Sequence, residues 1–142
     1  MNAKVLLVDD DVSVRESLGR VLESEGYGVV AVAGSTAALE RLCSEAVDLV
    51  LLDINMPIIN GWDAFEQMRA INPFLPVIVI TARPHQQDTA AAVGVTALME
   101  KPLMLTELLG LMEHVLTETV ESRRQRLVEH RLLSVAGPGG DD

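Results

Sequence analysis

Residues 49–57 are Leu49-Val50-Leu51-Leu52-Asp53-Ile54-Asn55-Met56-Pro57, in which four apolar residues lead into a carboxylate and then into a turn. A run this short and this apolar is typical of a strand buried on both faces. Pro57 cannot donate a ladder hydrogen bond, so the strand should end within a few residues of Asp53. The sequence therefore predicts Asp53 at the carboxyl end of a central strand, where open parallel sheets bind ligands.

Length and composition indicate one globular domain. The chain has 142 residues, of which 49% are hydrophobic and 23% charged, enough for a real core. We expect no membrane span and no signal peptide, and the single cysteine, Cys43, excludes an internal disulfide and suits the cytoplasm. The net charge of −10 argues against a free-standing nucleic-acid binder.

Periodicity predicts four further strands, at residues 5–8, 27–32, 76–80 and 95–99. Helices are expected at about residues 12–25, 62–71, 89–93 and 105–116, and at 35–45 with Ser35 as the N-cap. Five strands alternating with five helices predict an α/β fold, a doubly wound parallel sheet with helices on both faces.

Several predicted strands end in residues that can do chemistry. Asp9 and Asp10 follow the first strand, Thr81 follows the fourth and Lys101 follows the fifth. Each has a plainer alternative: an aspartate can cap the next helix, Thr81 can be an ordinary hydroxyl and Lys101 a solvated charge. Capping needs only one aspartate, however, and adjacent like charges repel. We therefore expect the aspartates to bind a metal ion.

Four motifs together carry a family resemblance: Val8-Asp9-Asp10-Asp11, Asp53-Ile54-Asn55-Met56-Pro57 with Gly61, Ile80-Thr81-Ala82, and Lys101-Pro102. Each is weak alone, but the set, in this order and at these intervals, resembles the receiver domain of bacterial two-component response regulators from about residue 3 to residue 116. The resemblance implies a flavodoxin-like receiver fold of five parallel strands in the order 2-1-3-4-5.

The same residues suit the transfer of a phosphoryl group onto Asp53. Asp9, Asp10, Asp53 and the backbone carbonyl of Asn55 offer the hard oxygen ligands that Mg²⁺ prefers. The cation and the ammonium group of Lys101 would balance the charge of the phosphoryl oxygens. Asp53 is then the phosphoacceptor, and the only catalysis expected is transfer to, and hydrolysis from, this aspartate.

The resemblance also implies partners and a signal. The donor would be a sensor histidine kinase or a phosphotransfer protein, and a small acyl phosphate could replace it. The Thr81 hydroxyl would move to bind the phosphoryl group and shift the surface of helix 4, strand 5 and helix 5. Receivers commonly have an aromatic residue three positions before the lysine, where this chain has Leu98, so we expect a smaller rearrangement.

The end of the chain is expected to differ from the domain before it. Residues 1–118 would form the receiver, and residues 119–142 a charged extension, partly helical and then disordered. Its arginines alternate with glutamates, which favours a salt-bridged helical face over nucleic-acid binding. The chain is expected to be either a single-domain regulator that contacts an unknown downstream protein or a receiver without its output domain. An apolar line at Leu105, Leu109, Met112 and Leu116 suits sheet packing and also a homodimer.

Two other classes of function stay open. A Mg²⁺-dependent aspartyl-phosphate phosphatase usually has an acidic residue two positions after the nucleophile, where this chain has Asn55. A phosphorylation-independent interaction module would retain the acidic pocket only as a relic or a structural metal site, and Leu98 is the one feature in its favour.

Overall fold

The computed structural model describes residues 3–55, 61–82 and 95–118, together with residues 121, 122, 125, 128 and 133–135. Within these residues the strands are β1 (Lys4–Val8), β2 (Gly28–Val32), β3 (Leu49–Asp53), β4 (Val77–Thr81), β5 (Ala97–Glu100) and β6 (Leu133–Val135). The helices are α1 (Val12–Ser24), α2 (Ser35–Ser44), α3 (Gly61–Ile71) and α5 (Leu105–Thr117). The helix expected at residues 89–93 lies outside the described residues.

The strand order of the sheet is β2-β1-β3-β4-β5-β6. The predicted α/β fold and its order 2-1-3-4-5 are therefore confirmed, with a short sixth strand added beside β5. The chain divides into two compact units, Met1–Val77 and Ile78–Asp142. No helix in the described part of the chain has the length and apolar composition needed to cross a bilayer.

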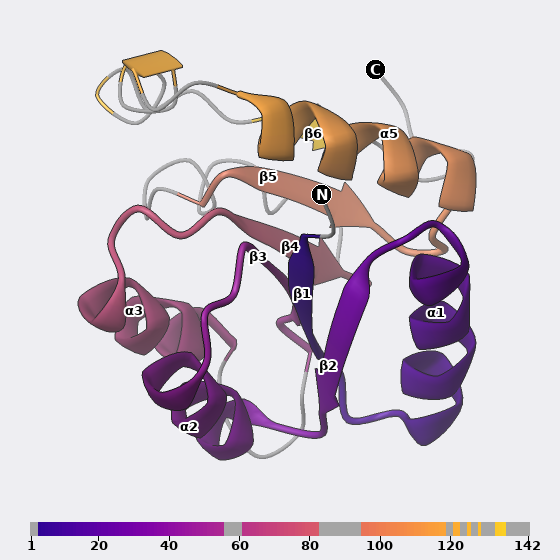
Figure 1. Ribbon diagram of the computed structural model, residues 1–142, viewed down its shortest axis with the longest axis horizontal. Helices are drawn as coiled ribbons and strands as arrows, with labels where there is room; N and C mark the ends of the chain where they lie inside the picture. The colour runs from indigo at the N-terminus through magenta and orange to yellow at the C-terminus, as the bar shows by residue number, and fades with distance from the viewer. Residues whose placement is uncertain are drawn as a thin grey trace. The chain divides into compact units, whose positions relative to one another are not determined.

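The first unit contains three parallel strands with helices on both sides. β1 pairs with β2 on one edge and with β3 on the other. Helix α1 lies on one side of these strands, and α2 and α3 lie together on the other (Figure 1). Each helix turns apolar side chains inward, such as Leu22 of α1 and Met68 of α3, which are at most 1% exposed. The doubly wound arrangement thus follows from helices with one apolar face.

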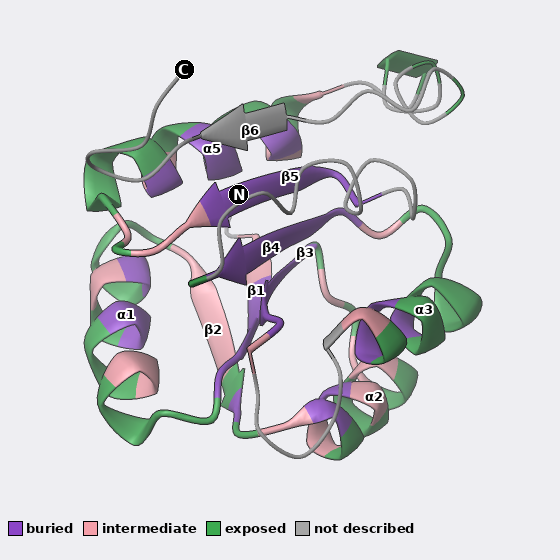
Figure 2. Ribbon diagram, turned by 180° about the vertical axis from the view of Figure 1, so that it is seen from behind, coloured by how far each residue is buried: buried purple, intermediate pink, exposed green. Residues whose placement is uncertain are grey.

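The central strand β3 is apolar because it is buried on both faces. Leu49, Val50, Leu51 and Leu52 are all 0% exposed, and β3 is coloured as buried in Figure 2, whereas β2 at the edge is mostly intermediate. Alternating apolar and polar residues would have indicated a strand with one solvent-exposed face. Residues 49–52 do not alternate, and this correctly predicted a strand that is covered on both faces.

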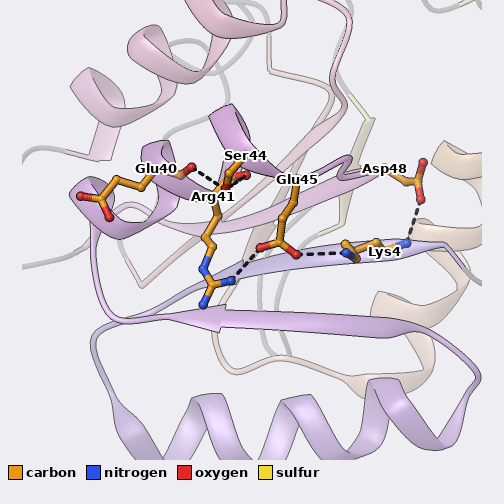
Figure 3. Close-up of polar contacts among 6 residues, drawn as sticks. All are labelled: Lys4, Glu40, Arg41, Ser44, Glu45 and Asp48. Atoms are coloured by element: carbon orange, nitrogen blue, oxygen red, sulfur yellow. Dashed lines mark hydrogen bonds and ion pairs between the residues drawn. The ribbon is translucent and has the colours of Figure 1, made fainter.

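A polar cluster holds the amino ends of β1 and β3 in register (Figure 3). The Lys4 N–H donates to Oδ2 of Asp48, and the Asp48 N–H donates to the Lys4 carbonyl, each at 2.8 Å. Glu45, just after α2, accepts from Nη1 of Arg41 at 2.7 Å and from Nζ of Lys4 at 3.0 Å. These cationic groups, Arg41 first, hold the pKa of Glu45 below its ordinary value of 4.5.

In the second unit, β5 pairs in parallel with β4 on one side and with β6 on the other. Helix α5 lies beside β5 in both views (Figures 1 and 2). Its residues Leu108, Met112 and Val115 are each 0% exposed, as their helical spacing predicts.

Glycines lie at the C-terminal end of α1 and at the N-terminal end of α2. Gly26 has a φ of 96°, a left-handed conformation that favours glycine, and it directly follows Glu25, the C-cap of α1. The prediction that Ser35 caps α2 is wrong. Gly34 is the N-cap, no side chain caps this helix, and Ser35 is its first residue. The chain is still extended at Gly34 (φ −166°, ψ 178°), and Ser35, which is 5% exposed, already lies in the first helical turn.

The sixth strand was not predicted. Residues 121, 122, 125 and 128 are helical, and Leu133–Val135 forms β6 beside β5. The short apolar run Leu132-Leu133-Ser134-Val135, followed by Gly137-Pro138, is a weak strand signal of the kind that only pairing to a neighbour can establish.

Candidate metal and phosphoacceptor site

The register of β1 with β3 brings two aspartates to the same edge of the first unit. Val8 pairs with Leu52, and Asp9 and Asp53 are the next residues of the two strands. Asp9 also donates its N–H to the Val32 carbonyl at the end of β2, at 3.1 Å. The carboxyl ends of parallel strands meet at one edge of a sheet, so Asp9 and Asp53 lie side by side.

Three carboxylates form a cluster at this edge. Asp9, Asp10 and Asp53 each place a carboxylate oxygen within 4.8 Å of the others. Asp9 and Asp53 are each 3% exposed, whereas Asp10 is exposed. Two buried carboxylates at such short range repel each other in a medium of low dielectric constant. The cluster therefore has the charge and the open side that a cation requires.

Local turns orient the two buried carboxylates. The Asp11 N–H donates to Oδ1 of Asp9, and the Asn55 N–H donates to Oδ1 of Asp53, each at 2.9 Å. In both cases an aspartate accepts from the amide two residues further on, the Asx turn that aspartate favours where a strand ends. The strand thus fixes the position of each carboxylate, and the turn after it fixes the orientation.

The three consecutive aspartates have different structural roles. Asp11 is the N-cap of α1, and its Oδ1 accepts from the N–H groups of Ser13 at 2.8 Å and Val14 at 3.3 Å. Asp9 and Asp10 instead join Asp53. Within this acidic run one aspartate caps the helix and the other two join the carboxylate cluster, and the binding of a metal ion by that cluster stays a prediction.

Arg15 is a supporting residue that the sequence analysis missed. Its Nη1 donates to the backbone carbonyl of Asp9 at 2.8 Å, which ties the first turn of α1 to the end of β1. An arginine on the first turn of a helix that follows an acidic run is the available signal, although such residues are common on solvated faces.

Asn55 is half-buried and follows Asp53 closely. Its N–H is directed at Asp53, as described above, and its carbonyl stays a predicted metal ligand. The donor set fits a hard divalent cation, because carboxylate oxygens are the ligands that Mg²⁺ and Ca²⁺ prefer and none of the three clustered side chains is a soft ligand.

Thr81 and Lys101 lie together in the second unit. Thr81 is the last residue of β4, is 0% exposed and pairs with Glu100 of β5. The Lys101 N–H donates to the Thr81 carbonyl at 2.8 Å, and Lys101 is half-buried. The Lys101–Pro102 peptide bond is cis. Both predicted residues thus stand at the carboxyl ends of neighbouring parallel strands.

Residues 5–113 match the family model of the response regulator receiver domain. The chain belongs to this family. It is 37% identical over 121 residues to the response regulator MprA of Mycobacterium ulcerans, covering 84% of this chain and 52% of that protein. The receiver domain of two-component systems is therefore the class to which the candidate site belongs.

Solved receiver structures have the same fold. The CheY-like receiver domain protein of Methanospirillum hungatei JF-1 superposes with a TM-score of 0.77 at 25% identity, covering 89% of this chain and 99% of that one. The response regulator TrrA of Thermotoga maritima, solved in complex with Mg²⁺ and BeF, gives a TM-score of 0.73 at 29% identity, covering 80% and 98%. The predicted receiver fold is confirmed.

This receiver spans about half the length of the curated relatives it matches. Their length beyond the matched part is not represented in these 142 residues. The activities of the relatives as whole proteins therefore do not follow for this receiver. The acidic cluster belongs to the matched part, since Asp9, Asp10 and Asp53 all fall within residues 5–113.

Proposed function

We propose that this receiver accepts a phosphoryl group on Asp53 from a histidine kinase or a phosphotransfer protein, with Mg²⁺ held by Asp9, Asp10, Asp53 and the Asn55 carbonyl. The observation that carries the proposal is the cluster of three carboxylates within 4.8 Å, in a family defined by its receiver fold. The complex of the related TrrA with Mg²⁺ and BeF supports the choice of metal.

Asp53 has the position that a phosphoacceptor needs. Its carboxylate is buried, ends a rigid central strand and is oriented by the Asn55 N–H, so little reorganisation precedes attack. An Asp53 oxygen forms the new O–P bond while the P–N bond of the donor phosphohistidine breaks, and the departing imidazole takes up a proton. Bound Mg²⁺ would balance the charge of the phosphoryl oxygens and offset the repulsion among the carboxylates.

Thr81 and Lys101 complete the proposal. We assign the Lys101 ammonium group to the phosphoryl oxygens as a second positive charge, and the Thr81 hydroxyl to a hydrogen bond with the phosphoryl group. Support comes from their common place at the carboxyl ends of β4 and β5, the end of a parallel sheet that binds ligands.

The proposed chemistry is limited to one residue of the protein itself. The receiver transfers a phosphoryl group to Asp53 and later hydrolyses it, and it does not turn over an external substrate. Its product is a conformational signal, carried by the surface of β5, α5 and the helix expected at residues 89–93. Leu98 is 1% exposed within β5, so a change in its packing is the expected readout in place of an aromatic ring.

The proposed setting follows from the same assignment. We place the protein in the cytoplasm, with a histidine kinase as donor and either a downstream protein or an output domain as target. Residues 1–118 form the receiver and residues 119–142 an extension in this proposal. The net charge of −10 over the 142 residues disfavours direct nucleic-acid binding by this chain, and a homodimer through α5 stays an alternative way of signalling.

Intact-mass measurement after incubation with Mg²⁺ and a small acyl phosphate tests the proposal. We expect one added phosphoryl group, labile to hydroxylamine, on the wild type and none on Asp53→Asn. Asp48→Asn is the matched control, because Asp48 precedes the same strand at its other end and should leave the adduct unchanged.

The other outcomes separate the competing functions. If the acyl phosphate gives no adduct, a histidine-kinase donor is tried next. Absence of the adduct with both donors, despite Mg²⁺ binding, would favour the phosphorylation-independent interaction module. Turnover of an external phosphoester would favour the phosphatase.

A further inference from the structure

The outer side of β5 is covered by a strand from much later in the chain. β6 pairs in parallel with β5, with Ala97 opposite Leu133, Leu98 opposite Ser134 and Met99 opposite Val135. β6 ends the strand order, so β5 would be the edge strand without it. An edge strand presents N–H and C=O groups to which any extended segment can add.

The first three residues of β5 carry no feature that discourages pairing along this edge. Ala97, Leu98 and Met99 are apolar and at most 1% exposed. Charged residues and prolines are two features by which natural edge strands discourage pairing, and within β5 only the last residue, Glu100, is charged and none is a proline. Covering such an edge is therefore favourable, and the segment that covers it belongs to the same unit of the chain.

We infer that the outer edge of β5 is a strand-binding surface, and that the chain's own segment Leu133–Val135 is its resident occupant. An extended segment from another protein can add to β5 only after this segment leaves. The C-terminal part of the chain therefore acts as a built-in competitor for the surface. This inference does not depend on phosphorylation and is tested without Mg²⁺ or a phosphoryl donor.

The backbone directions identify which amide β6 protects. The Lys101 N–H donates to Thr81 and is therefore directed at β4. Successive backbone groups of a strand alternate between its two sides, so the Met99 N–H also faces β4. The Leu98 N–H then faces β6.

The same alternation in β6 gives the backbone N–H groups of Ser134 and Val135 opposite directions. Leu98 is opposite Ser134, and the backbone N–H and C=O of Leu98 both face β6. In a parallel ladder such a residue bonds to the residues before and after the one opposite it, here Leu133 and Val135. The Val135 N–H is therefore directed at Leu98, and the Ser134 N–H is directed away from β5. A proline at 135 removes a ladder donor, whereas a proline at 134 does not.

Residue-resolved hydrogen exchange on the full chain tests the inference. In Val135→Pro the Leu98 amide should exchange at least about tenfold faster than in wild type, because its covering strand is released. The Met99 amide, which faces β4, should keep its wild-type rate and serves as the internal reference. Ser134→Pro and Val135→Ala both keep the backbone N–H at position 135 that is directed at Leu98. Both variants should therefore leave the Leu98 amide protected.

Three results would overturn the inference. The first is unchanged Leu98 exchange in Val135→Pro. The second is equal acceleration of Leu98 and Met99, which would mean that the whole strand had loosened. The third is Leu98 protection that increases with protein concentration, since the occupant would then be the segment of a second copy.

Discussion

Asp9, which directly follows β1, and Asp53, which ends the adjacent parallel strand β3, have carboxylate oxygens within 4.8 Å of each other and are each 3% exposed. The register of β1 with β3 produces this relationship, because Val8 and Leu52 are partners and the two aspartates follow them. The fold thus holds two like charges together out of water. Such an arrangement costs stability unless a cation compensates it, and this cost is the reason why we propose a cation at this edge.

Asp10 should have opposite effects on stability without and with a divalent cation. Asp10→Asn removes one like charge from the cluster, so it should raise the melting temperature of the metal-free protein. At a free Mg²⁺ concentration of about 100 times the dissociation constant, wild type should gain about 2.7 kcal/mol, and Asp10→Asn should lose most of this gain. Thermal unfolding with and without Mg²⁺ measures both effects.

Asp11→Ala is the matched control for this prediction. Asp11 caps α1 and is not part of the cluster, so its loss should lower the free energy of unfolding by about 1 kcal/mol. The Mg²⁺-dependent gain should remain. A gain that is lost equally in both variants would show that the site depends on the acidic run as a whole.

Lys101 should affect the rate of phosphorylation. Lys101→Met removes the second positive charge proposed for the phosphoryl oxygens, so phosphorylation of Asp53 by an acyl phosphate should slow on the order of 10²-fold. The other lysine of the sequence is Lys4, which pairs with Glu45 at the amino end of β1, the end away from the aspartates. Lys4→Met is therefore the control. Equal rates for the two variants would remove Lys101 from the mechanism.

Thr81 should affect the signal more than the phosphorylation itself. Phosphorylation of wild type should move the chemical shifts of β5 and α5, including Leu98, because the Thr81 hydroxyl draws its strand end toward the phosphoryl group. Thr81→Ala should still gain the phosphoryl mass but lose these distant shifts, and Thr81→Ser should retain them. Shifts confined to the surroundings of Asp53 in wild type would contradict the proposed output surface.

Glu45 should contribute to stability in a pH-dependent way. Its pKa is lowered in the folded state by Arg41 and then Lys4, so its contribution is present above the ordinary pKa of 4.5 and is lost as the pH falls through the lower folded value. Denaturant unfolding should find Glu45→Gln less stable than wild type near neutral pH, with the two converging in acid. Glu40→Gln, whose side chain points away from this cluster in Figure 3, should show no such convergence, and a similar curve for both would contradict the assignment.

Local residue patterns were sufficient for most of the fold. The apolar run at residues 49–52 predicted a strand buried on both faces, and all four residues are buried. The apolar line expected along α5 is only partly buried, because Met112 is 0% exposed whereas Leu105 is 43% exposed. The ends of β4 and β5 lie one residue further than predicted, at Thr81 and Glu100, because the register of the two strands pairs these residues with each other.

The candidate site was predicted only as a set of residues. Strand ends identified Asp9, Asp10 and Asp53, because parallel strands share an edge and the aspartates follow apolar runs. Nothing in the letters Asp9-Asp10-Asp11 distinguishes the cap from the clustered pair. That division depends on where α1 begins and on the direction of each side chain, which the packing of α1 against its strands determines.

The sequence by itself determined the fold class, the strand order implied by its family and the acidic edge, because these depend on periodicity and on residues next to one another in the chain. Only the tertiary structure decided that Gly34 rather than Ser35 caps α2, that Arg15 holds the Asp9 carbonyl, and that Leu133–Val135 is a strand. Each of these features depends on a partner distant in the sequence or on burial. The residue pattern of a three-residue segment is too weak a signal to predict its pairing with a strand far away in the chain.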